Sequence, residues 1–246
     1  YGIIGVACCQ WFYFESISRI PIAISLLIEF IAPIFVVLFA HFVWKQPVRP
    51  TVWLGLTLAT IGLALVQQVW LGVTLNLLGI YYALLSMMCL VVMYLLADKA
   101  SRTRDPVSLL MWAFIASASF FAVLRPWSEF PWESLQATVQ PFDNRTLTLP
   151  IAYLFGYMVV GGTLLPYVLV INSIRHIGGA GASIMGLTEP PVAAIIAWAV
   201  IGASEALNTV QMLGGLVILL GILMAENARE SARRRLLVST EVAEVV

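Results

Sequence analysis

The chain has 246 residues, of which 61% are hydrophobic and only 11% are charged. Water-soluble domains carry about 25% charged residues, so this composition excludes an ordinary soluble domain and indicates an integral membrane protein. The formal net charge is zero, which gives no electrostatic reason to expect a nucleic-acid partner.

Apolar segments long enough to cross a bilayer core of roughly 30 Å recur along the chain with short polar breaks between them. Barrel strands would be shorter and would alternate in hydrophobicity, so the pattern predicts an all-α, polytopic bundle with eight transmembrane helices. In chain order these predicted spans are residues 1–14, 21–43, 52–69, 75–96, 107–124, 151–171, 180–201 and 207–225. From residue 226 the composition becomes basic and then acidic, so residues 226–246 are predicted to form a mobile tail.

Lysine and arginine are distributed unequally between the two sides that these spans define. Ten of the 13 lie on the side of the tail, and the other three are Arg19, Arg125 and Arg145. Cytoplasmic loops carry an excess of these residues, so the pattern predicts a cytoplasmic C-terminus and an outer position for the long connection at 125–150. We expect a multi-pass protein of the cell's inner, cytoplasmic membrane.

Two parts of the sequence resemble each other. The matching positions, at offsets of 157 and then 159 residues, are Ser16, Ile17, Ile20 and Pro33 with Ser173, Ile174, Ile177 and Pro190, and Gly55 and Gly62 with Gly214 and Gly221. The predicted orientation sends the two copies across the membrane in opposite directions. Inverted repeats of this kind are typical of secondary transporters, whose substrate sites lie near the midplane, often on broken helices.

The residues around these matches also resemble a known family. The motifs are Ile20-Pro21, Ile28-Glu29-Phe30-Ile31-Ala32-Pro33, Thr188-Glu189-Pro190-Pro191 and the glycine-rich stretch from Glu205 to Gly221. They resemble the EamA-type drug/metabolite transporter superfamily, and within it the branch related to threonine and homoserine exporters. The resemblance implies two inverted repeats of five helices, with export as the direction of transport.

This family plan predicts how the chain is divided. Residues 1–69 would form the last three helices of the first EamA-type repeat, and residues 75–225 would form a complete second repeat of five. Residues 226–246 would be the cytoplasmic tail. Eight helices of an expected ten would then be present, so the chain is interpreted as N-terminally truncated.

Two glutamates lie deep in predicted spans. At 1.5 Å per residue, Glu29 is about 12 Å in from the start of its span and Glu189 about 14 Å in from the start of its own. A carboxylate at the membrane centre is costly, on the order of 3 kcal/mol, so we predict that both bind substrate or couple transport to protons. The alternative is that they only hydrogen-bond neighbouring helices and hold the bundle together.

Prolines are predicted to break the same two helices. Pro33 leaves the carbonyl of Glu29 without an amide partner, and Pro190 and Pro191 do the same for Gly186 and Leu187. Gly186 is the counterpart of Glu29 at the repeat offset. Each copy therefore places a carboxylate within one turn of a broken helix.

Other residues are weaker candidates. Trp11, Tyr94, Trp112 and Tyr157 could line a cavity and hold a cationic amine, or they could pack in the core or against lipid. The glycine stripes could bring two helices together within the chain or between the copies of a homodimer. Cys8, Cys9 and Cys89 fall within predicted spans, where a thiol behaves as a small apolar side chain. His41 and His176 are not spaced as a metal pair, and neither a metal nor a cofactor is expected.

These observations predict a secondary transporter. It would move small amphipathic metabolites such as amino acids across the lipid bilayer by alternating access, with protons as one possible coupling ion. The alternatives are a multidrug or nucleotide-sugar transporter of the same superfamily, or a membrane fragment that does not transport. An enzyme is not expected, because the sequence lacks His-Glu-x-x-His and Gly-x-Ser-x-Gly motifs. A retinal receptor would need a lysine within a span, and both lysines lie in predicted loops.

Overall fold

The computed structural model describes residues 1–68, 76–124, 128, 130–139, 148–201 and 208–245. Within these residues the regular secondary structure is helical, apart from one pair of two-residue strands. The helices up to the long connection are η1 (Gly2–Cys8), α1 (Cys9–Ile17), α2 (Ile22–Glu29), α3 (Ala32–Phe42), α4 (Pro50–Gln67), α5 (Leu77–Ser101) and α6 (Pro106–Leu124). The elements after it are η3 (Trp132–Gln136), β1 (Thr138–Val139), β2 (Leu149–Pro150), α7 (Ile151–Val159), η4 (Val160–Leu164), α8 (Leu165–Gly186), α9 (Glu189–Ile201) and α10 (Thr209–Val245).

Local sequence signals set several helix starts. The side chain of Asn76 caps α5 by accepting hydrogen bonds from the amides of Leu78 and Gly79. Asp105 accepts in the same way from two amides in the first turn of α6, with Oδ2 3.1 Å from each nitrogen. Pro50 occupies the first position of α4, where its missing amide hydrogen costs nothing.

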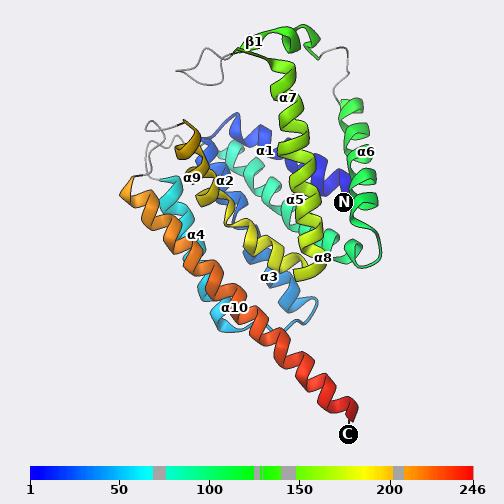
Figure 1. Ribbon diagram of the computed structural model, residues 1–246, viewed down its shortest axis with the longest axis vertical. Coiled ribbons are helices and arrows are strands. Elements are labelled where there is room, and N and C mark those ends of the chain that lie inside the picture. Colours follow the sequence, from blue (N-terminus) through cyan, green and yellow to red (C-terminus); the bar gives the residue numbers. More distant parts are fainter. Residues whose placement is uncertain (69–75, 125–127, 129, 140–147, 202–207, 246) are drawn as a thin grey trace.

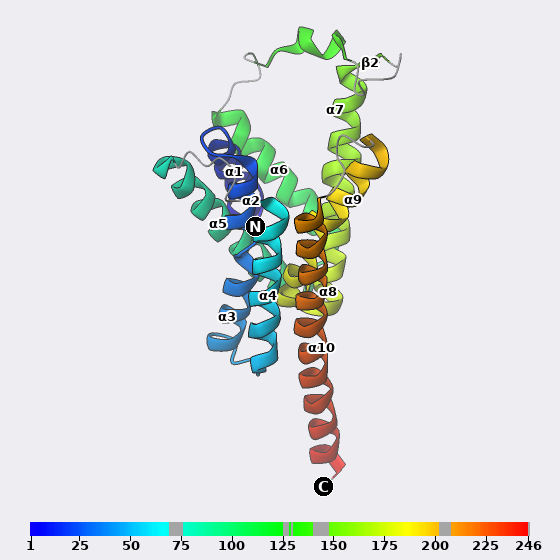
Figure 2. The same cartoon turned by 90° about the vertical axis from the view of Figure 1, so that its left-hand side faces the viewer.

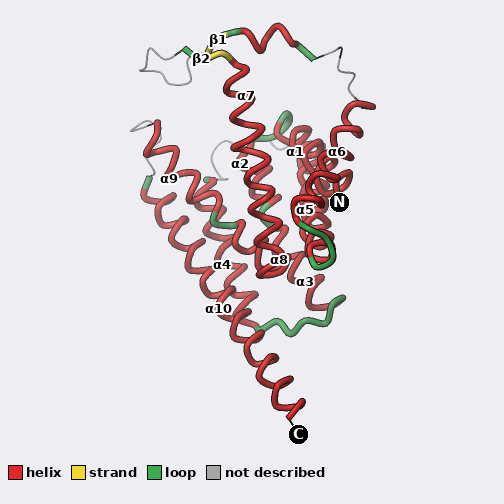
Figure 3. Tube along the Cα trace, turned by 45° about the vertical axis from the view of Figure 1, so that its right-hand side comes forward, coloured by secondary structure: helices red, strands yellow, loops and turns green. Residues whose placement is uncertain are grey.

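The helices are arranged in a bundle with α5 near its centre (Figure 1). The α5 helix contacts η1, α1, α2, α3 and α8, so it joins the N-terminal helices to α8, which follows the long connection. The buried apolar core includes Val36, Leu56, Val91, Ile184 and Ile218, which come from five different helices. The short β1–β2 pair lies at one end, at the start of α7 (Figure 3).

Among the residues that the structure describes, six segments are long and apolar enough to cross a membrane, which agrees with the predicted polytopic helical protein. The prediction of eight spans differs from the structure in two places. Residues Gly2–Ile17 form an apolar helix that is shorter than the other spans. The predicted span at 180–201 is interrupted between Gly186 and Glu189.

The connection between the predicted spans at 151–171 and 180–201 contains a turn at Gly178. Its backbone has φ 78° and ψ 164°, outside the helical region, and a residue with a side chain rarely adopts this conformation. The chain turns back at this point and continues toward α9 (Figures 1 and 2). Two limbs of opposite direction therefore meet at Gly178, and the second limb is broken again after Gly186.

The predicted tail begins within a helix. From residue 226 the chain continues as part of α10 to Val245 (Figure 2). No glycine or proline follows Gly221, and alanine, glutamate, arginine and leucine are strong helix formers. Arg229 also pairs with Glu226 one turn before it. The predicted span limits at residues 69, 75 and 207 lie outside the described residues.

Helices α4 and α10 pack side by side through the predicted glycine stripes (Figure 1). A Cβ atom on Gly55 would lie 2.5 Å from the carbonyl oxygen of Gly221, and one on Gly62 would lie 2.7 Å from that of Gly214. Because the earlier glycine of α4 meets the later glycine of α10, the two helices run antiparallel. The glycines thus allow close packing of two backbones within one chain.

This packing predicts a specific sensitivity at Gly55. Gly55→Ala places a methyl group against a backbone oxygen that has no room to move, which should lower the free energy of unfolding by about 1–3 kcal/mol. Gly156→Ala is the matched control, because a Cβ atom at Gly156 meets nothing within 4 Å. Thermal unfolding of the two purified variants in detergent measures the difference, and equal melting temperatures would contradict the close contact.

Candidate functional site

Two helix breaks in the structure share one geometry. After α2 ends at Glu29, two residues intervene before α3, and after α8 ends at Gly186, two residues intervene before α9. The amide of Ile31 donates to Ile28 at 3.2 Å, and the amide of Thr188 donates to Met185 at 3.0 Å. These two tightened turns lie 157 residues apart, as do the prolines that follow them.

Each break leaves main-chain carbonyls without their helical partners. The carbonyl of Glu29 would bond to the amide of residue 33, and that of Gly186 to the amide of residue 190, but both positions are proline. Leu187 loses its partner to Pro191 in the same way. The negative ends of α2 and α8 are therefore available at the breaks.

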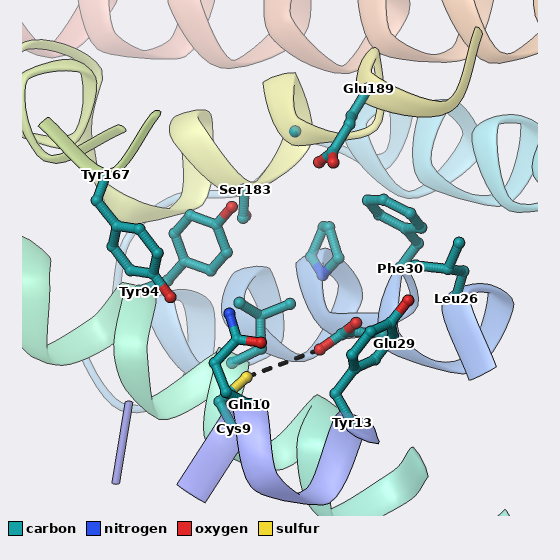
Figure 4. A pocket seen from close by; sticks show the side chains of 13 residues that line it. Cys9, Gln10, Tyr13, Leu26, Glu29, Phe30, Tyr94, Tyr167, Ser183 and Glu189 are labelled. Atoms are coloured by element: carbon teal, nitrogen blue, oxygen red, sulfur yellow. Dashed lines mark hydrogen bonds between the residues drawn. The ribbon is translucent and has the colours of Figure 1, made fainter. Parts of the chain in front are cut away.

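A pocket of about 290 Å³ lies between these two breaks. It is lined by Cys9, Gln10, Tyr13, Leu26, Glu29, Phe30, Pro33, Leu90, Tyr94, Tyr167, Ser183, Gly186 and Glu189. Glu29 and Glu189 approach the pocket from opposite walls, the first from α2 and the second from α9 (Figure 4). The structure thus brings together two carboxylates that are 160 residues apart in the sequence.

Glu29 is held by hydrogen bonds from two other helices. The hydroxyl of Ser86, on α5, lies 2.7 Å from Glu29 Oε1, and the thiol of Cys9, on α1, lies 3.7 Å from the same oxygen (Figure 4 shows the second contact). Ser86 and Cys9 are both buried. This carboxyl group therefore has a fixed position where α1, α2 and α5 meet.

The hydroxyl group of Ser86 has two hydrogen-bond acceptors beside it but only one proton to donate. Its oxygen lies 3.1 Å from the carbonyl oxygen of Cys9 as well as 2.7 Å from Glu29. If Glu29 carries a proton on Oε1, it can donate to Ser86, and Ser86 can donate to Cys9. A protonated Glu29 completes this chain of hydrogen bonds, whereas an ionised Glu29 competes with Cys9 for one donor.

Glu189 has a different environment. It is the first residue of α9, where a negative charge is favourable to the helix dipole. Its side chain is more exposed than that of Glu29 and lies on the opposite wall of the pocket. One carboxyl group is thus fixed by hydrogen bonds, while the other faces open space in the same pocket.

The other residues predicted from the sequence are placed as follows. Pro33, Gly186 and Tyr94 line the pocket together with the two glutamates. Pro190 and Pro191 lie in the first turn of α9, and Pro191 packs beside Gly215 of α10. The remaining three aromatic candidates do not line this pocket, because they lie on the outer surface of the bundle. The exposed fractions are 38% for Trp11, 58% for Trp112 and 77% for Tyr157.

Several residues of the pocket were missed by the sequence analysis. These are Cys9, Gln10, Tyr13 and Tyr167. Ser86 was missed as well; it lies behind the pocket wall and hydrogen-bonds Glu29. Polar side chains within apolar spans are a usable signal, since they rarely face lipid. Cys9 was interpreted as a small apolar residue, but its thiol contacts a carboxylate. Among the described residues no three side chains gather as metal ligands.

These features define a polytopic helical membrane protein with an acidic pocket between two broken helices. The sequence profile of the EamA-like transporter family matches residues 1–67 and 77–226, which is nearly the whole chain. The chain therefore belongs to the EamA-like transporter family, and its members are transporters of the drug/metabolite superfamily. A comparison with curated proteins gives no match.

The fold is also similar to that of a solved structure. A protein described only as "Crystal structure of protein" superimposes with a TM-score of 0.70 at 15% sequence identity. The match covers 92% of this chain and 75% of that chain. At this low identity the likeness concerns the fold alone.

The contact between Ser86 and Glu29 predicts a measurable coupling energy. In a double-mutant cycle, Ser86→Ala and Glu29→Met should be non-additive by about 0.5–3 kcal/mol in the free energy of unfolding, because each removes the same hydrogen bond. Glu133 lies exposed in η3, outside the pocket, so Ser86→Ala combined with Glu133→Met should be additive. Additivity in both cycles would contradict the contact.

Proposed function

We propose that this protein is a secondary transporter that moves small amphipathic metabolites bearing an amine, such as amino acids, by alternating access. The observation that carries the proposal is the meeting of Glu29 and Glu189 in one pocket beside two matching helix breaks. Buried carboxylates in membrane helices are costly, and they mark substrate and proton pathways. Export is the direction implied by the resemblance to threonine and homoserine exporters.

We further propose that the two halves are inverted repeats and that eight helical segments cross the membrane. The glycine contacts between α4 and α10 support this arrangement. Gly55 and Gly214 are counterparts in the sequence, as are Gly62 and Gly221, yet Gly55 packs on Gly221 and Gly62 on Gly214. This exchange of partners is what a two-fold axis perpendicular to the antiparallel helices would produce.

The two carboxyl groups suit an exchange of a proton for an ammonium group. Two carboxylates in one desolvated pocket repel each other, so the pocket is stabilised when a proton or a cation lies between them. Glu29 can hold a proton in the hydrogen-bond chain through Ser86 to Cys9. Arrival of an ammonium ion would displace that proton, which couples the movement of the two.

The alternative of a nucleotide-sugar carrier is less well supported. Such a substrate carries phosphates, and phosphate sites use arginine, lysine or free helix N-termini. The residues that line the described pocket include no lysine, arginine or histidine. The charge of this pocket is therefore opposite to that required.

Replacing the fixed carboxyl group should uncouple the transporter. Glu29→Gln keeps the size and hydrogen bonding of the side chain but cannot release a proton, so substrate flux in proteoliposomes should fall about tenfold or more and lose its dependence on a pH gradient. Glu133→Gln makes the same chemical change outside the pocket and should leave the flux unchanged. Full pH-dependent flux in the Glu29→Gln protein would exclude the proposed role.

The proposed orientation can be tested by thiol labelling. In a background with Cys8, Cys9 and Cys89 replaced by alanine, Lys99→Cys should react with a membrane-impermeant maleimide only after the cells are permeabilised. Glu133→Cys should react in intact cells, because the positive-inside pattern places it on the outer side. Both side chains are exposed in the structure. The reverse labelling pattern would invert the proposed topology.

A further inference from the structure

We infer that the pocket selects an organic ammonium ion that carries no carboxylate of its own. This inference rests on the proposed function, that of a transporter of amine-bearing metabolites, but replaces its example: it retains amines and amino alcohols as substrates and excludes free amino acids. It follows from three properties of the pocket wall, which are its charge, its main-chain groups and its aromatic rings.

The charge of the wall has one sign. Glu29 and Glu189 are its acidic residues, and none of the residues that line it is basic. Three arginines form ion pairs away from the pocket: Arg19 pairs with Glu15, Arg102 with the buried Asp98, and Arg229 with Glu226. A positive group in the pocket finds two counter-charges, whereas a carboxylate on the same molecule finds none.

The main-chain groups at the helix breaks also favour a positively charged ligand over a negatively charged one. Broken helices often bind a substrate carboxylate through free amides at the start of the second half-helix. In α9 the second and third residues are Pro190 and Pro191, which have no amide hydrogen, and the first residue is Glu189. In α3 the second residue is Pro33. The starts of α9 and α3 therefore have fewer amide N–H groups with which to bind an anion, and the first residue of α9 already carries a carboxylate.

The opposite ends of the breaks present carbonyl groups. Gly186 has no side chain, so it lines the pocket with main-chain atoms, and its carbonyl lacks a helical partner. The carbonyl of Glu29 is in the same position at the other break. Both belong to helix C-termini, whose dipoles attract cations. The carboxylates and the C-terminal ends of the helices therefore both attract a cation.

Aromatic rings complete the wall. Tyr13, Phe30, Tyr94 and Tyr167 surround the space between the two glutamates (Figure 4). Ring faces attract an ammonium group and also accommodate an apolar substituent. The volume of about 290 Å³ lies at the small end of the range for ligand pockets, about 300–1,000 Å³. These features fit a small amine with one apolar substituent.

A matched pair of ligands tests the inference. Phenylalanine and phenylalaninol have the same ring and the same ammonium group, but the second has a hydroxymethyl group in place of the carboxylate. Binding to the purified protein, measured by isothermal titration calorimetry at neutral pH, should be at least about tenfold tighter for phenylalaninol, because the carboxylate of phenylalanine would be repelled by two glutamates and would find no basic residue. 3-Phenylpropionate, which has the carboxylate but no amine, should not bind.

Two variants locate the preference in the pocket. Glu189→Gln removes the negative charge at the start of α9 and should reduce the ratio between the two affinities several-fold. Glu133→Gln removes a charge outside the pocket and should leave the ratio unchanged. The ligand comparison on the unaltered protein remains decisive if the first variant does not fold.

The outcomes separate this inference from the proposed function. Equal affinities, or tighter binding of phenylalanine, would overturn the selection against carboxylates and leave a transporter of amino acids. Failure of phenylalaninol to bind would also overturn the inference, while pH-dependent flux of other solutes in proteoliposomes would keep the transporter. Absence of flux for a broad panel of amines and amino acids would overturn the proposed function itself.

Discussion

Every main-chain polar group in the hydrocarbon region needs a hydrogen-bond partner. In this structure, main-chain carbonyl groups lack their helical partners at the two helix breaks. The carbonyls of Glu29 and Gly186 lose their helical partners to Pro33 and Pro190. In lipid such groups would cost several kcal/mol, but here both residues line a pocket. The pocket, the carboxylates beside it and the bent helices that form its walls are consequences of this one constraint.

The helices around the pocket give its two walls different mechanical support. Glu29 is fixed where α1, α2 and α5 meet, through buried Ser86 and Cys9. Glu189 is the first residue of α9, after the second helix break, and its side chain is exposed. The close packing of α4 against α10 keeps the two sides together. The pocket thus has one wall with a carboxyl group fixed by hydrogen bonds and one wall built from short, interrupted helices.

Patterns of single residue types predicted a large part of this arrangement. The two breaks and the glycine contacts follow from prolines and glycines, whose backbone properties act locally, and the sequence locates both. Whether a side chain points into the pocket or toward the outer surface depends on packing between helices that are distant in the sequence. Trp11 and Tyr13 are two residues apart on α1, yet one lies on the outer surface and the other lines the pocket. The turn at Gly178 falls within the connection that the sequence predicts between residues 171 and 180.

The two carboxyl groups of the pocket would be enough to couple the proposed movement of an ammonium substrate to that of a proton, because both cations would compete for the same site. With both carboxyl groups ionised and no cation present, the pocket holds two like charges in a desolvated space, which is unfavourable. A proton on Glu29 relieves this repulsion and completes the hydrogen bonds from Ser86 to Cys9, and an ammonium ion relieves it by pairing with the carboxylates. The empty, fully ionised pocket is therefore the state of highest free energy. A carrier that rearranges only from its low-energy states would cross the membrane loaded with one cation or the other, which is the condition for exchange.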